Sequence, residues 1–206
     1  MGLNIDFNKL CGRLALIPIP FFMLGLLTSS LFGVYLGDYT VLLNTISELG
    51  SLEFTPFPEA INLTFIITAL FLTTFFYVLF RKIYSKTKDT KRARYLTYIG
   101  FGMFMLLIFC FFFVGIFSVD VNLSAHLGFA TTLFISLLTG EFIFGYLIIR
   151  YRVFKRYFGI AMISFHIIIS IFFPIFPDAT SILEWVVFFI LLIWGLPLSF
   201  HLRKGY

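Results

Sequence analysis

The residues best suited to chemistry in this chain are a histidine and several carboxylates at the ends of long apolar runs. His126, Glu48 and Asp120 are the candidate catalytic residues, because a histidine beside carboxylates can act as a general acid or base. The same residue types, together with amides and a serine, can hold a polar ligand by hydrogen bonds. The candidate ligand-binding residues are Asn44, Ser47, Glu48, Asn62, Asp120, His126 and Glu184.

These residues predict no metal site and no cofactor site. The group holds one histidine and lacks the HExxH or HxH spacing that is typical of zinc sites. The chain also lacks a P-loop, a GxSxG motif and a Rossmann fingerprint. The sequence therefore leaves open whether the protein is an enzyme.

The elements that position these residues are long apolar runs, since 60% of the residues are hydrophobic and only 12% are charged. Soluble domains carry about 25% charged residues. Each of six runs has roughly 20 residues, enough for a helix to cross a hydrocarbon core of about 30 Å. We predict an all-α polytopic membrane protein in which residues 1–206 form one six-helix domain, with spans at about 14–34, 60–80, 96–117, 125–149, 158–176 and 182–200. Pro18 and Pro20 are expected to bend the first span near its inner end.

The charges divide between the two ends of the predicted bundle. All 15 Lys and Arg residues precede the first span, join spans 2 and 3, join spans 4 and 5, or follow the last span. The opposite connections hold only acidic charges, among them Asp38, Glu53 and Asp178. The positive-inside rule therefore predicts a multi-pass protein of the cell membrane with cytoplasmic N- and C-termini. The basic loops are expected to attract anionic membrane lipids and not nucleic acid.

The longest outer connection, 35–59, joins the first two spans. The segment from Val41 to Leu49 predicts a short helix, because its apolar and polar residues separate onto opposite faces, and Gly50 is a suitable stop. With this topology, all seven candidate ligand-binding residues fall near the outer headgroup level. They either line a common pocket or cap helix ends in headgroup water.

Two ionisable residues, Glu141 and His166, fall inside predicted spans, where a polar group is costly. Glu141 is interpreted either as a carboxyl bonded to a hydroxyl such as that of Thr139, or as part of a proton or ion relay. His166 is interpreted as a histidine bonded to a serine or a carbonyl across the bundle.

Two segments resemble a known group of six-span membrane proteins. The run Asn44-Thr45-Ile46-Ser47-Glu48-Leu49-Gly50, followed by Pro56, Pro58 and Asn62, resembles the first outer loop of a prokaryotic family of unknown function with an I-S-E-L-G motif. It is also similar to the eukaryotic Frag, DRAM and Sfk superfamily, whose members carry I-S-[DE]-x-G there. Gly115-Ile116-Phe117, then Asp120 and His126, resembles the aromatic end of span 3 and the histidine opening span 4 in that group.

The resemblance implies functional positions at Ser47, Glu48, Gly50, Asn62 and His126. Eukaryotic members are associated with remodelling of glycosylphosphatidylinositol lipids, with lipid asymmetry and with autophagy. We therefore expect a protein that binds or processes a lipid or glycolipid headgroup in an outer-leaflet pocket. The alternatives are a non-enzymatic structural or partner-binding membrane protein, and a small-solute or proton-coupled transporter with a midplane cavity near Glu141 and His166.

Overall fold

The computed structural model describes residues 7–41, 43–175 and 180–204, whose regular elements are all helices, with no strand among them. The predicted all-α architecture is therefore confirmed for this part of the chain. The helices are α1 (Phe7–Leu14), α2 (Pro18–Leu36), the 3₁₀ turn η1 (Ser47–Gly50), α3 (Glu59–Thr87), α4 (Lys91–Ile116), α5 (Val119–Tyr151), α6 (Arg156–Ile175) and α7 (Thr180–Lys204).

Within the described ranges, five helical segments are long and apolar enough to cross a membrane. They are Leu10–Leu36, Glu59–Thr87, Lys91–Ile116, Val119–Tyr151 and Glu184–Arg203. The apolar part of α6, Arg156–Phe172, is shorter than these five. The predicted fifth span ends at residue 176, which lies outside the described residues, as does Asp178. The chain is thus a helical bundle of membrane-spanning character, and its sixth span stays a prediction.

The helices extend beyond the apolar runs that predicted them. Backbone hydrogen bonding within a helix does not depend on side-chain polarity, so α3 continues through Arg81 and Lys86 to Thr87. At the other end of the chain, α1 stops at Leu14 and α2 starts at Pro18. The bend predicted at Pro18 and Pro20 takes the form of an interruption of the helix before Pro18, because proline has no N–H to continue the helix.

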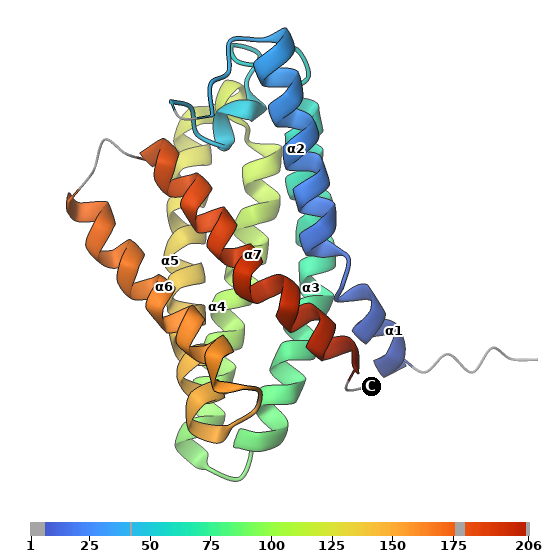
Figure 1. Cartoon of the computed structure of the whole chain (residues 1–206), viewed down its shortest axis with the longest axis vertical. Coiled ribbons are helices and arrows are strands. Elements are labelled where there is room, and N and C mark those ends of the chain that lie inside the picture. Colours follow the sequence, from blue (N-terminus) through green and yellow to red (C-terminus); the bar gives the residue numbers. More distant parts are fainter. Residues whose placement is uncertain (1–6, 42, 176–179, 205–206) are drawn as a thin grey trace, which may run out of the picture.

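The helices form an elongated bundle in which α3, α4 and α5 pack against their neighbours in sequence (Figure 1). α7 crosses obliquely in front of them, and α6 diverges from the bundle toward its far end. The connection between α2 and α3 lies at the same end as the turn between α4 and α5. The connections α3–α4 and α5–α6 lie together at the opposite end.

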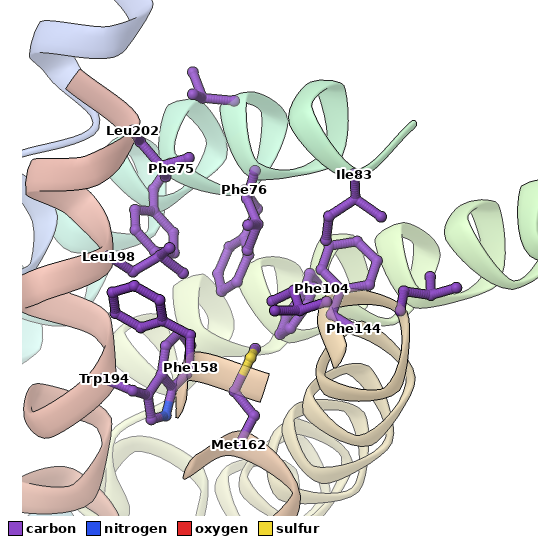
Figure 2. Packing of buried hydrophobic residues seen from close by; sticks show 14 of the residues in the cluster. Phe75, Phe76, Ile83, Phe104, Phe144, Phe158, Met162, Trp194, Leu198 and Leu202 are labelled. Carbon is purple, nitrogen blue, oxygen red and sulfur yellow. The ribbon is translucent and has the colours of Figure 1, made fainter. Parts of the chain in front are cut away.

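Stacked phenylalanine rings join α3, α4 and α5 in the core of the bundle. Phe76 on α3 stacks on Phe104 on α4 with ring centroids 4.0 Å apart, and Phe104 meets Phe144 on α5 edge-on at 5.0 Å (Figure 2). Gly100 makes room for this packing, since a Cβ there would lie 2.5 Å from the Phe144 ring. Small residues let transmembrane helices approach closely, and here the space is filled by aromatic rings.

Candidate functional site

The connection between α2 and α3 contains a helical turn with reciprocal capping. The Glu48 carboxylate accepts the Thr45 N–H at 2.7 Å, and the Thr45 hydroxyl accepts the Glu48 N–H at 3.3 Å. This pair is a capping box, a motif that marks the start of a helix, and the turn begins two residues after Thr45, at Ser47. The predicted helix from Val41 to Leu49 is therefore corrected to the turn Ser47–Gly50. Residue 42 of the predicted helix lies outside the described residues.

Glu184 on α7 holds the start of this turn from across the bundle. Its Oε2 accepts the N–H of Ile46 at 2.8 Å and that of Ser47 at 3.4 Å. The first N–H groups of a helical turn have no partner within the turn, and they carry partial positive charge. A carboxylate from α7 therefore satisfies both donors and fixes the loop above the end of that helix. Ser181, also on α7, adds a hydrogen bond to the Leu43 carbonyl at 2.8 Å.

Asp120 on α5 holds the other end of the turn. Its two carboxylate oxygens accept the Ser51 hydroxyl at 2.6 Å and the Leu52 N–H at 2.7 Å. Gly50 packs on Asn62 of α3, whose amide donates to the Gly50 carbonyl at 3.4 Å. A Cβ at Gly50 would lie 2.5 Å from the Asn62 side-chain oxygen, so this contact requires glycine. Three helices thus hold the loop over one end of the bundle.

Tyr39 hydrogen-bonds to backbone carbonyls of the loop through its hydroxyl. The ring is buried, and its hydroxyl lies 3.0 Å from the Thr45 carbonyl and 3.3 Å from the Asn44 carbonyl. Burial raises the pKa of Tyr39, so the hydroxyl stays protonated and donates to these acceptors. The sequence interpretation did not include Tyr39, although a tyrosine with an apolar ring and a polar tip is typical of membrane interfaces.

His126 lies beneath the loop with one ring nitrogen free. α5 is interrupted at Asn122, whose side-chain oxygen accepts the Ala125 N–H at 3.0 Å and restarts the helix. His126 Nδ1 lies 2.8 Å from the Phe117 carbonyl oxygen, so Nδ1 carries the hydrogen and donates it. Nε2 is then an acceptor in the neutral ring. It is buried without a hydrogen bond of ordinary geometry in a side chain that is 2% exposed, and the Val114 backbone lies near the ring.

A cavity of about 100 Å³ lies next to this histidine. Its polar lining comes from Ser47, His126 and Glu184, and the rest is apolar. The apolar lining includes Phe22 of α2, Phe65 of α3 and Phe111 of α4. The cavity therefore sits between the loop and the interior of the bundle, with its hydrogen-bonding groups on the loop, α5 and α7.

The seven residues selected from the sequence divide into two groups. Ser47, His126 and Glu184 line the cavity. Asn44, Glu48, Asn62 and Asp120 lie in the loop or bond to it, and the cavity lining does not include them. Glu48 and Asp120, two of the candidate catalytic residues, hold backbone N–H groups of the loop in place. The loop motif therefore positions the cavity, and only its serine contributes to the lining.

The cavity combines serine, histidine and glutamate, the residue types of a hydrolytic triad. In such a triad the histidine joins the serine and the acid by hydrogen bonds. Here His126 Nδ1 bonds a backbone carbonyl, and the Ser47 hydroxyl pairs with the Thr45 hydroxyl at 3.1 Å. The arrangement therefore offers hydrogen-bond acceptors to a ligand and has no assembled nucleophile. Among the described residues, no group of three His, Cys, Asp or Glu side chains is placed to hold a metal ion.

The two ionisable residues inside the spans lie apart from this cavity. Glu141 is fully buried, and neither carboxyl oxygen has a hydrogen-bond partner, so the interpretation of a bond to Thr139 is wrong. Its polar neighbour is the Trp194 indole, whose N–H also lacks a hydrogen bond of ordinary geometry. The His166 ring lies 5.2 Å from that of Phe142, and its Nδ1 has no partner, so the interpretation of a bonded histidine finds no support at that atom.

Comparison with known proteins yields no match to a family model, to a curated protein or to a solved structure. The class of this protein therefore rests on its own architecture. It is a bundle of long apolar helices, compatible with an integral membrane protein, that carries a mainly apolar cavity with Ser47, His126 and Glu184 at its edge under a fixed loop. The resemblance to the I-S-E-L-G group stays an expectation from the sequence.

Proposed function

We propose that this protein is a six-span cell-membrane protein that binds the polar head of a membrane lipid in the cavity beneath the outer loop. The observation that carries the proposal is His126 Nε2, a buried acceptor without a hydrogen bond of ordinary geometry, in the lining that it shares with Glu184. A buried polar group without a partner costs free energy. A ligand that donates a hydrogen bond there relieves that cost.

The charge of the cavity selects the kind of head. The lining contains the Glu184 carboxylate and no Lys or Arg, because every Lys and Arg of the chain belongs to the opposite connections or to the ends of the chain. Phosphate recognition relies on Arg, Lys or backbone N–H groups, and Glu184 already occupies the N–H groups of Ile46 and Ser47. A head rich in hydroxyl donors, such as the sugar of a glycolipid, fits the available acceptors.

The orientation belongs to the same proposal. The loop and its cavity face the outer side, and the N- and C-termini lie in the cytoplasm. The basic connections between α3 and α4 and between α5 and α6 then meet the inner leaflet, where anionic lipids attract Lys and Arg by about 1 kcal/mol each. The lipid head would enter from the outer leaflet.

Replacing His126 by phenylalanine, or Glu184 by glutamine, is expected to weaken binding of an alkyl glucoside to the protein in nanodiscs. Each change removes or weakens one acceptor of the cavity, which corresponds to roughly a tenfold loss of affinity. Binding is measured by native mass spectrometry of the retained glucoside. The control is His201→Phe on the exposed side of α7, which is expected to bind as wild type does. Equal retention of the glucoside by wild type, His126→Phe and Glu184→Gln would refute this binding site for the lipid head, called the head site below.

A further inference from the structure

A second cavity, of about 110 Å³, continues from the first toward the middle of the bundle. It is lined by residues of α2, α3, α4, α5 and α7, so it lies in the bundle interior. The two cavities share six lining residues, which are Phe22, Phe111, Leu133, Leu137, Phe188 and Leu191. The two cavities are therefore adjacent within the bundle, with these side chains between them.

One face of α5 follows the two cavities from the polar end to the apolar end. His126, Ala130, Leu133 and Leu137 recur every three or four residues, and they form a single stripe along the helix. His126 belongs to the outer cavity alone, and Leu137 borders both. At about 1.5 Å per residue the stripe is roughly 16 Å long.

The inner cavity suits hydrocarbon and not water. Its side-chain polar groups are the Thr68 hydroxyl, which is buried without a hydrogen-bond partner, and the Trp194 indole N–H, whose polar neighbour is Glu141; the remaining lining is apolar. A buried water needs two to four polar partners at once, whereas apolar cavities stay dry and accept apolar molecules. Trp194 itself is 2% exposed and packs among Phe158 and Leu198 at the inner end of this cavity (Figure 2).

We propose that one hydrocarbon chain of the bound lipid lies inside the bundle, in the inner cavity, while its head donates to His126 and Glu184. This inference rests on the proposed head site and adds the position of the chain. The inner cavity alone offers about 110 Å³, somewhat less than the engineered cavity of about 150 Å³ that takes up benzene, so it admits a short segment of the hydrocarbon chain.

Binding of the polar head draws the hydrocarbon chain of the lipid into the inner cavity. Lipid tails are as apolar as the side chains of the cavity, so a hydrocarbon gains little by leaving the bilayer for the protein. Selective filling of the inner cavity therefore requires the polar contacts at the outer end. The ligand class is a glycolipid or another amphiphile with a hydroxyl-rich head and one chain free to enter.

Fluorescence quenching can locate the chain, because the protein has two tryptophans and one of them lines the inner cavity. In a Trp185→Phe background, the remaining emission comes from Trp194. An alkyl glucoside with a brominated chain is titrated into nanodiscs of unbrominated phosphatidylcholine. The inference predicts saturable quenching of Trp194, relieved by an excess of unbrominated glucoside.

A matched pair of variants tests the route. Leu72 lines the inner cavity, and Leu70 on the same helix is 62% exposed. Leu72→Phe narrows the cavity and is expected to raise the half-saturating concentration roughly tenfold, whereas Leu70→Phe leaves it unchanged. Because the quenching of the Trp185→Phe protein is measured without either variant, a Leu72→Phe protein that fails to fold does not remove the test.

The outcomes separate the chain position from the head site. Saturable quenching of Trp194 emission that is lost in His126→Phe supports both the position of the hydrocarbon chain and the binding of the head at His126. Retention of the glucoside by native mass spectrometry without quenching of Trp194 overturns the chain position and leaves the head site standing. Quenching that rises linearly without saturation reports bromine in the bilayer and also overturns the chain position. Absence of both retention and quenching overturns both proposals.

Discussion

Alanine at position 120 is expected to release the outer loop from α5. Asp120 accepts two hydrogen bonds from the loop, at 2.6 Å from Ser51 and 2.7 Å from Leu52, and it lies in the first turn of α5 where a negative charge is favourable. Hydrogen bonds to charged groups contribute about 1.5–3 kcal/mol each. The bond from Leu52 is exposed to solvent, which reduces its contribution. We expect Asp120→Ala to lower the free energy of loop opening by about 2 kcal/mol, which raises the open population roughly 30-fold.

Amide hydrogen exchange of residues 49–55 measures this opening directly. The matched control is Glu53→Ala, because Glu53 is an exposed acid in the same loop whose carboxylate makes no hydrogen bond to the described residues. Ser51→Ala removes one of the two bonds and is expected to give an intermediate rate. Exchange in Asp120→Ala at the rate of the Glu53→Ala control would show that the loop is held by other contacts.

Leucine at position 141 is expected to make the protein more stable. The Glu141 carboxyl is fully buried, with the Trp194 indole as its polar neighbour and no hydrogen bond of ordinary geometry at either oxygen, a state that costs about 1–3 kcal/mol. Leucine has a similar volume and no polar atoms, so Glu141→Leu is expected to raise the free energy of unfolding by about 1–3 kcal/mol. Glu141→Gln keeps polar atoms buried and is expected to give a smaller change.

Unfolding of the purified protein in mixed micelles, titrated with a denaturing detergent, measures both variants of Glu141. The ordering Leu, then Gln, then wild type would identify Glu141 as a residue kept at a cost to stability, which is typical of functional carboxyls in membrane helices. A clear loss of stability in both variants would show that the carboxyl makes a favourable interaction in the membrane.

The parts of the fold that depend on local sequence pattern could be predicted from the sequence. Long apolar runs predicted the helices because a spanning backbone must satisfy its own hydrogen bonds. The break before Pro18 followed from the missing N–H of proline. Helix ends were less accessible, since α3 continues through charged residues to Thr87 without any change in backbone bonding.

The site was only partly accessible, for a physical reason. Expected depth in the membrane grouped Ser47, His126 and Glu184 with the other candidates, and the structure places these three around one cavity. The capping pair of Thr45 and Glu48 is readable from its spacing, and it explains why the turn starts later than its hydrophobic pattern suggests.

Contacts between distant segments have no such local signature. The bonds from the loop amides to Glu184 join residues more than a hundred positions apart, and no periodicity encodes them. The Phe117 carbonyl that orients His126 lies only nine positions before it, but across the turn between α4 and α5, where helical periodicity does not apply. These contacts decide which carboxylates face the cavity and which hold the loop.

The most direct test of the account is the nitrogen resonance of His126 itself. The chain has three histidines, so labelling histidine with ¹⁵N gives a small set of signals that includes two internal references, His166 and His201. On addition of an alkyl glucoside to the protein in nanodiscs, the account predicts that Nε2 of His126 shifts as it accepts a hydrogen bond, while the other two histidines stay in place. A His126 signal that does not move at saturating glucoside would contradict the account. So would a signal that moves equally with an alkyl compound that lacks the sugar.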